Sequence, residues 1–285
     1  MKLPPFDYAC PTTLPEAVQL LAARDGDAKA IAGGQSLVPM LAFRLAQPSL
    51  LVDLRKLPDL RGIKISEKGV TLGAMVRWRD IEDDERLDTA HPLLKAAIAH
   101  VAHYQVRNRG TVGGSLAHAD PAAEMPGVAI TCDAEIAVVG KSGAHAIQAA
   151  DFFQGALTTA LTPDEIIVEI RLPPWPVGRR WGFEEFARRR GDFAMAAAAV
   201  FYDQDENGKA RNAHVGVIGV ADRPLRLPAV EGVLNGRAID AAIIAKAEAA
   251  ASAAVDPQDD IHASAAYRRA LVGTLVERAL KRAAA

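Results

Sequence analysis

The chain contains two pairs of adjacent glycines, each set between an apolar residue and a small polar residue. Residues 32–36 read AGGQS, and residues 111–115 read TVGGS. A glycine pair permits backbone conformations that a side chain forbids, and it lets successive amide groups approach a ligand without an intervening Cβ atom. Two such segments that converge from different parts of the fold would grip both phosphates of a dinucleotide.

A glycine pair by itself is most often a turn, so the pairs alone do not identify a ligand. Neither pair fits the G-x-G-x-x-G spacing of the parallel dinucleotide-binding fold, and neither carries the Gly-Lys-Ser/Thr of a P-loop. The hydroxyl groups of Ser36, Thr111 and Ser115 favour phosphate binding because they add hydrogen-bond donors. Both a phosphate site and a pair of plain turns remain open at this point.

The surroundings of each pair predict local structure. The first pair lies between a predicted strand over residues 28–32 and a predicted helix that starts at Leu37, and a further strand follows over residues 50–52. The second pair follows a predicted helix over residues 91–104. After it, Asp120-Pro121 combines a cap residue with the residue favoured in a first turn, which predicts that a short helix starts there.

The remaining pattern predicts two domains, in keeping with a length of 285 residues. Hairpins are predicted over residues 63–75 and 134–147, and a half-buried strand over residues 166–172. The stretch PPWPVGRR, residues 173–180, has three prolines and a glycine and predicts a linker. Beyond it we expect two strands joined at Glu206-Asn207-Gly208, and then helices near residues 228–234, 240–254 and 264–283.

Composition excludes several classes of function. The 33 basic residues nearly cancel the 35 acidic ones, so nucleic acid is not an expected partner. No apolar run is long enough to predict membrane insertion, and the opening MKLPPFDYACP lacks the apolar core of a secretory signal, which predicts a cytoplasmic protein. The two cysteines, Cys10 and Cys132, are too few to hold an iron–sulfur cluster and lack zinc-site spacing. We expect both to be reduced thiols.

Three stretches carry a family resemblance: AGGQSLVPMLAFRL, VRNRGTVGGSLAHADPAAEMP and FARRRGDFAMAAAA. Together they resemble the medium, FAD-binding subunit of molybdenum hydroxylases of the carbon monoxide dehydrogenase and xanthine dehydrogenase type. The likeness runs nearly the whole length and includes DDIHASAAYRRAL near the end. It does not select a substrate, because members of the family share these motifs while oxidising different compounds.

The resemblance implies an α+β fold. We expect a two-lobed FAD-binding domain of the vanillyl-alcohol-oxidase-like (PCMH) type over residues 1–174, with lobes of about 1–55 and 56–174. The C-terminal domain, residues 178–285, would be an antiparallel sheet with helices.

The resemblance also implies which residues contact FAD. One side of the diphosphate would be held by Ala32, Gly33, Gly34, Gln35 and Ser36, and the other by Thr111, Gly113, Gly114 and Ser115. Leu37 would also contact the cofactor. Asp120 and Glu124 would accept hydrogen bonds from ribityl or ribose hydroxyls, a role that suits a carboxylate. For Asp120 a helix cap alone is the alternative. Leu161 and Ala102 match positions that approach the cofactor by backbone or apolar contact.

Several residues depart from the family pattern or stay outside it. Some relatives carry a lysine that reaches the flavin near the positions of Glu184 and Glu185; this chain has carboxylates there, so no flavin contact is expected. Phe193 stands where relatives have a tyrosine, and its ring could stack or fill space, or be an ordinary core aromatic. His100 and His103 have helical spacing but no third ligand, so no metal site is predicted. No residue is predicted to be catalytic.

The family assigns the chain an oxidoreductase role as an FAD-binding electron-transfer subunit. A large partner subunit would hold the molybdenum cofactor, and a small partner subunit would hold 2Fe–2S clusters whose electrons reach an external acceptor through FAD. The expected assembly is a dimer of heterotrimers. The alternatives are a self-sufficient FAD-dependent oxidase, which needs an acid or base beside the flavin, and a non-catalytic scaffold in which the glycines are only turns.

We expect FAD to be bound noncovalently, because no cysteine or histidine lies inside either glycine motif to anchor it. Acid precipitation of the folded, flavin-loaded protein should release the flavin into the supernatant, where chromatography should identify it as FAD. Flavin that stays with the pellet, or FMN in its place, would contradict this prediction.

Overall fold

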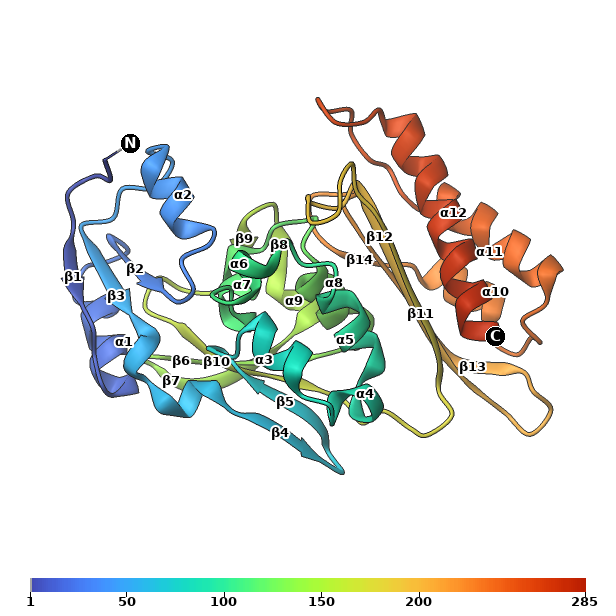
Figure 1. Cartoon of the computed structure of the whole chain (residues 1–285), viewed down its shortest axis with the longest axis horizontal. Coiled ribbons are helices and arrows are strands. Elements are labelled where there is room, and N and C mark those ends of the chain that lie inside the picture. Colours follow the sequence, from blue (N-terminus) through green and yellow to red (C-terminus); the bar gives the residue numbers. More distant parts are fainter. Residues whose placement is uncertain (1) are drawn as a thin grey trace.

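The computed structural model describes residues 2–285, in which sheets from three successive parts of the chain lie side by side (Figure 1). The first part, residues 2–53, is here called the N-terminal lobe. Its elements are β1 (Asp7–Ala9), α1 (Leu14–Ala22), β2 (Ala28–Ile31), α2 (Leu37–Ala42) and β3 (Leu50–Asp53). The strands form a parallel sheet in the order β1-β3-β2. As its central strand, β3 is buried along its whole length, which accounts for the apolar residues 50–52.

Helix α1 shows how the sequence specifies this lobe. The hydroxyl oxygen of Thr13 accepts the amide of Glu16 and caps the helix, and a proline follows within the first turn. The residues buried on its inner face are Ala17, Val18 and Leu21. They form a core with Leu50 and Val52 of β3.

Residues 54–172 form the middle region, an antiparallel sheet in the order β4-β5-β10-β6-β7 covered on one side by short helices. The elements in chain order are η1 (Leu54–Lys56), η2 (Pro58–Arg61), β4 (Ile63–Ser66), β5 (Gly69–Gly73), α3 (Trp78–Asp83), α4 (Leu87–Ala90), α5 (Pro92–Ile98), α6 (Tyr104–Arg107), α7 (Val112–His118), α8 (Glu124–Thr131), β6 (Glu135–Gly140), β7 (Gly143–Gln148), α9 (Ala149–Phe152), β8 (Phe153–Gly155), β9 (Thr158–Thr159) and β10 (Ile166–Leu172). Both predicted hairpins are confirmed as β4-β5 and β6-β7.

The predicted helix over residues 91–104 is wrong in its length, because α5 ends at Ile98. Ala102 has a φ of 43°, a left-handed conformation that a continuing α-helix excludes. The carbonyls of Val101 and Ala102 instead accept the guanidinium of Arg107, which follows on α6. The segment between α5 and α6 is therefore held by a side chain from α6.

The C-terminal region is an antiparallel sheet in the order β11-β12-β13-β14, backed by helices on the side away from the middle region (Figure 1). Its elements are β11 (Arg180–Phe186), β12 (Ala196–Gln204), β13 (Ala210–Ile218), β14 (Leu225–Arg226), α10 (Pro228–Leu234), α11 (Ala241–Ala253) and α12 (Ala265–Ala284). The three predicted C-terminal helices and the turn at residues 206–208 are confirmed.

Strand β12 explains how the C-terminal sheet joins the rest of the molecule. Successive side chains of a strand point to opposite faces, so one alternate set packs against α11 and α12 and the other against the middle region. The set that packs against the helices is Ala196, Ala198, Val200 and Tyr202. The set that packs against the middle region is Ala197, Ala199 and Phe201. Small side chains on both faces allow close approach. A Cβ atom on Gly216 of the neighbouring β13 would lie 1.8 Å from Oγ1 of Thr131 in the middle region.

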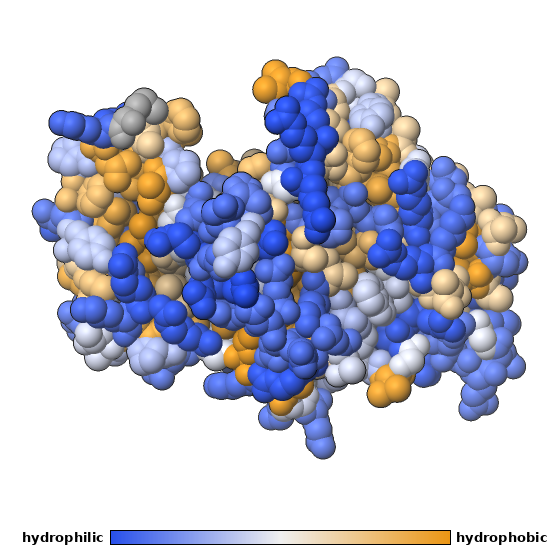
Figure 2. All heavy atoms as spheres, in the orientation of Figure 1, coloured by the Kyte–Doolittle hydropathy of each residue, from blue (hydrophilic) through white to orange (hydrophobic). Residues whose placement is uncertain are grey.

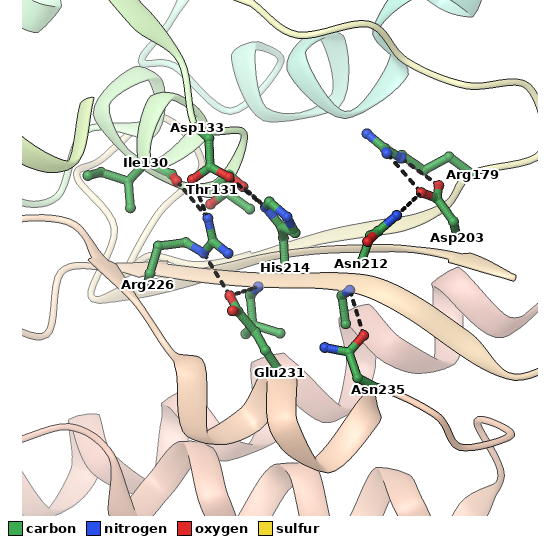
Figure 3. Close-up of polar contacts among 12 residues, drawn as sticks. Ile130, Thr131, Asp133, Arg179, Asp203, Asn212, His214, Arg226, Glu231 and Asn235 are labelled. Carbon is green, nitrogen blue, oxygen red and sulfur yellow. Dashed lines mark hydrogen bonds and ion pairs between the residues drawn. The ribbon is translucent and has the colours of Figure 1, made fainter. Parts of the chain in front are cut away.

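Charged groups at this junction are paired across it (Figure 3). The guanidinium of Arg226 binds both Asp133 of the middle region and Glu231 of α10. Nδ1 of His214 lies 2.8 Å from the carbonyl oxygen of Thr131, so this nitrogen carries the hydrogen. Within the C-terminal region, Nε and Nη2 of Arg179 each donate a hydrogen bond to one carboxylate oxygen of Asp203.

No helix among residues 2–285 combines the length and the apolar character that crossing a membrane requires.

Candidate functional site

A cavity of about 740 Å³ lies where the N-terminal lobe, the helices of the middle region and the loop between β11 and β12 meet. Figure 1 shows this place between α2 and the helices α6 and α7, and Figure 2 shows the surface hollowed beside the lobe. Every residue predicted to bind the cofactor lines the cavity: Ala32, Gly33, Gly34, Gln35, Ser36, Leu37, Ala102, Thr111, Gly113, Gly114, Ser115, Asp120, Glu124 and Leu161. The size and the mixture of apolar walls with a few polar groups are those of a small-molecule site.

The first glycine motif presents unpaired backbone donors to the cavity. None of the amide groups of residues 33–37 donates a hydrogen bond to another group of the described chain. The loop keeps its shape through other contacts, because Nε2 of Gln35 donates to the carbonyl of Gly33 at 3.1 Å. Ser36 precedes α2 but forms no capping bond, so its hydroxyl is also free to donate. Donors arranged in this way match an anion with several oxygen atoms.

The first motif is in direct backbone contact with the residues just before the second motif. A Cβ atom on Gly33 would lie 2.1 Å from the carbonyl oxygen of Arg109, which comes just before the second motif. Gly34 has a φ of 74°, which side chains disfavour. The first pair therefore needs one glycine for close packing and the other for the turn.

The second motif is not a loop with free amides, as the sequence suggested, but the first turn of α7. The amide of Gly113 donates to the carbonyl of Ala74, and the amide of Gly114 donates to Oγ1 of Thr111, which caps the helix. The amide of Ser115 donates to the carbonyl of Thr111. This motif thus contributes two hydroxyl groups and bare glycine surface to the cavity, while its amides stabilise the helix.

The two glycines of the second pair have different surroundings. A Cβ atom on Gly113 would lie 2.6 Å from the Cβ of Ala74, so Gly113 is required for packing inside the middle region. A Cβ atom on Gly114 would meet Oγ1 of Thr111 at 2.8 Å and would lie 3.8 Å from the Cβ of Ala32. Gly114 therefore faces the first motif across the cavity.

The predicted helix start at Asp120-Pro121 is wrong, because α8 begins at Glu124. Asp120 instead closes a turn, in which its side chain accepts the amide of Ala122 at 2.8 Å. Asp120 therefore caps no helix; it stabilises this turn and also lines the cavity.

Glu124 differs from the ionised acceptor that the sequence suggested. Its side chain is nearly inaccessible, and burial raises its pKa to about 7, with a smaller contribution from the charge of Asp120. A carboxyl group that is partly protonated near neutral pH both donates and accepts hydrogen bonds.

Several lining residues gave no signal in the sequence. Met75 and Trp78 reach the cavity from the segment after β5, and Asp192 reaches it from the loop between β11 and β12.

Phe193 lies in the same loop and lines the cavity with 67% of its surface exposed. Phe193 is therefore not a core aromatic, and its ring stands at the mouth of the site.

The two carboxylates after Phe183 lie outside the cavity and have contrasting surroundings. Glu184 pairs with Arg282 of α12 at 2.7 Å. The side chain of Glu185 is buried, and its Oε2 has no hydrogen-bond partner among the described residues. Nδ1 of His100 lies 3.7 Å from the other oxygen. Burial, assisted by the charge of Glu124, raises the pKa of Glu185 to about 8.

Within residues 2–285, no three histidine, cysteine, aspartate or glutamate side chains come together as metal ligands would. His100 contacts the ring of Phe183 at 5.2 Å between centroids. Both cysteines are free thiols, and burial raises the pKa of Cys132 to about 12.

Comparison with known proteins identifies the class of cofactor. Residues 4–175 match the family described as the FAD binding domain in molybdopterin dehydrogenase, and residues 181–283 match the CO dehydrogenase flavoprotein C-terminal domain. The 6-hydroxypseudooxynicotine dehydrogenase complex subunit alpha of Paenarthrobacter nicotinovorans is 40% identical over 283 residues, which cover 99% of this chain and 96% of that protein.

Two solved structures are closely similar. A chain of carbon monoxide dehydrogenase from Hydrogenophaga pseudoflava superposes with a TM-score of 0.96 at 37% identity, covering 99% of this chain and 98% of that one. For quinoline 2-oxidoreductase from Pseudomonas putida 86 the TM-score is 0.94 at 39% identity, with 100% and 98% covered.

These matches define an oxidoreductase component with FAD as its cofactor. The chain belongs to the FAD-binding medium subunits of the molybdenum hydroxylase family. The resemblance inferred from the sequence and the predicted α+β fold are thereby confirmed.

Replacing Gly114 with valine should weaken FAD binding by at least about tenfold, because the side chain would occupy space between the two motifs. Fluorescence titration of the flavin-free chain with FAD would measure this. The matched control is Gly232→Val on α10, where a Cβ atom has no neighbour within 4 Å. Equal affinities in the two variants would contradict the placement of the cofactor.

Glu185→Gln should change how stability depends on pH. The folded chain holds a proton on Glu185 up to about pH 8, whereas the unfolded chain releases it near the ordinary value of 4.5. Between these values the folded state binds more protons, so this group's contribution to the free energy of unfolding falls as pH rises. The variant should match wild type near pH 5, measured by urea unfolding, and exceed its stability at pH 9 by roughly 1–3 kcal/mol.

The control for this experiment is Glu206→Gln, which changes an exposed carboxylate in the turn between β12 and β13. Its free energy of unfolding should follow wild type at both pH values. If the difference between Glu185→Gln and wild type is the same at pH 5 and pH 9, the buried carboxyl does not titrate as described.

Proposed function

We propose that the chain binds FAD in the cavity and serves as the electron-transfer subunit of a molybdenum-containing hydroxylase or dehydrogenase. The unpaired amides of residues 33–37, set in a cavity lined by every predicted contact residue, are the observation that supports this most strongly. In this role they would hold the diphosphate, together with the hydroxyl groups of Ser36, Thr111 and Ser115. The Oγ1 atom of Thr111 already accepts an amide, so its own hydrogen is left for the ligand.

The remaining walls suit the other parts of the cofactor. Asp120 and Glu124 lie together and offer hydrogen bonds to ribityl or ribose hydroxyls. Leu161 and Ala102 supply apolar and backbone contacts, and the exposed ring of Phe193 could cover an aromatic ring at the mouth. When bound, FAD supplies the redox chemistry, accepting and releasing one or two electrons. The chain's own residues bind it, orient it and shield it from water.

We further propose that the electrons come from 2Fe–2S clusters of a small partner subunit, that a large partner subunit holds the molybdenum cofactor, and that the assembly is a dimer of heterotrimers. The names of three relatives support the presence of partner subunits, because these proteins are called a complex subunit alpha, a medium subunit and a medium chain. An apolar patch supports a contact near the cavity. Val38, Phe43 and Leu45 are exposed on and after α2, whose Leu37 and Met40 line the cavity. Figure 2 shows apolar surface on this lobe.

We also propose that the chain divides into an FAD-binding domain, residues 1–174, and a C-terminal domain, residues 178–285. We further propose that the protein is cytoplasmic. The change of sheet at residues 173–179 supports the division. The shared core at β12 indicates that the two parts do not move independently.

An isolated, flavin-loaded subunit should be reduced by dithionite but should not oxidise an aromatic, purine or carbon monoxide substrate unaided. The test follows flavin absorbance under anaerobic conditions, first with the subunit alone and then with the large and small subunits added. Bleaching by substrate only in the mixture supports electron transfer from partners. Bleaching of the isolated subunit by any of these substrates would favour the self-sufficient oxidase.

A further inference from the structure

Arg268, near the N-terminal end of α12, is buried although it is charged, with 7% of its surface exposed. One terminal nitrogen, Nη1, donates to the carbonyl oxygens of Met195 and Gly219, both at 2.6 Å. The other, Nη2, donates to Oδ2 of Asp260 at 2.6 Å. One guanidinium thus joins three separate segments of the C-terminal region, none of which belongs to its own helix.

The first of these contacts fixes the base of the loop between β11 and β12. The amide of Met195 donates to the carbonyl of Phe186 at 2.8 Å and closes the loop, while Arg268 holds the carbonyl of Met195. Within the loop, Gly191, Asp192 and Phe193 line the cavity. The loop and the N-terminal end of α12 lie near each other at the top of Figure 1.

The second contact leads to another wall of the same cavity. Gly219, directly after β13, donates its amide to the carbonyl of Pro121 at 2.9 Å, and Pro121 directly follows Asp120. Gly219 also lies against the loop base, since a Cβ atom there would be 2.8 Å from the carbonyl oxygen of Met195. The carbonyls that Arg268 binds therefore connect to both the Asp192 side and the Asp120 side of the cavity.

The third contact orients Arg268. Oδ1 of Asp260 accepts the amides of His262 and Ala263, at 2.8 and 2.9 Å, so the turn before α12 is held around this carboxylate. Its other oxygen faces Arg268. A planar guanidinium with donors on two nitrogen atoms serves the carboxylate and the two carbonyls together, whereas a lysine ammonium has a single nitrogen.

We propose that Arg268 is a positioning residue for the FAD site. Through it, α12 fixes the position of the cavity wall around Asp192 relative to the wall around Asp120. Arg268 does not line the cavity itself and acts through the carbonyls of Met195 and Gly219. The inference rests on the proposed location of FAD in the cavity. Without the guanidinium, two carbonyls lose their charged donor, and the loop that carries Phe193 loses the contact that anchors it to α12.

The test compares Arg268→Met and Arg268→Lys with the control Arg269→Met. Arg269 is the next residue on α12, but its partners are the carbonyl of Val255 and the carboxylate of Asp256, away from the cavity. Three quantities are measured on the full chain: the Kd for FAD, the visible circular dichroism of the flavin at saturation, and amide hydrogen exchange over residues 187–195.

Arg268→Met should raise the Kd by about tenfold, change the flavin dichroism and speed exchange in the loop. Arg268→Lys should recover part of the affinity, and Arg269→Met should behave as wild type in all three measurements. If Arg268→Met keeps the wild-type Kd for FAD and the wild-type flavin dichroism, the proposal is overturned, even if amide exchange in the loop is faster. Arg268 would then have only a structural role.

Two further outcomes are separated by additional variants. If Arg268→Met does not fold, Asp260→Asn is used, because it replaces the carboxylate that orients Arg268 with a neutral amide. A smaller rise in the Kd for FAD, with a smaller change in the flavin dichroism and in the exchange of the loop, would support the proposal. Wild-type values of these quantities would overturn it. If Gly114→Val also keeps wild-type affinity for FAD, the proposed cofactor location fails. If Gly114→Val loses FAD and the Arg268 variants do not, only the role of Arg268 fails.

Discussion

The backbone of Gly33 lies directly against the backbone of Arg109, so close that a single Cβ atom would be 2.1 Å from the carbonyl oxygen. This contact joins the N-terminal lobe to the middle region at the point where the cavity forms. It also leaves the loop that follows, residues 33–37, with amides that point to no other part of the described chain. Close packing on one side of the loop and unpaired donors on the other come from the same glycine pair.

The two glycine motifs look alike in the sequence but do different physical work. The first is an open loop with free donors, and the second is a capped helical turn whose amides are already satisfied. Gly113 is needed because Ala74 lies against it, and Gly114 because the first motif lies opposite. The similarity of the two motifs thus reflects a shared need for close approach and not a shared hydrogen-bonding role.

The C-terminal region completes the cavity and is bonded to it at several points. Alternate small residues of β12 allow the sheet to pack between the middle region and its own helices, and the ion pairs around Arg226 neutralise charges at the junction. Glu185 is the contrasting case within the described chain, because its Oε2 is buried without a partner and its pKa is accordingly high. Burial without a compensating donor favours the neutral form.

The sequence determined the local elements and the family. The hairpins over residues 63–75 and 134–147 and the three C-terminal helices follow from rules that act over a few residues, and the motifs identified an FAD-binding subunit.

Only the tertiary structure decided where α5 ends, that α8 starts at Glu124 and not at Pro121, and which amides stay free. The amide of Gly113, for example, is satisfied by the carbonyl of Ala74, which lies far from it in the sequence. The pKa of Glu124, the exposure of Phe193 and the reach of Arg268 to the cavity walls depend in the same way on segments far apart in the chain, which local sequence rules do not bring together.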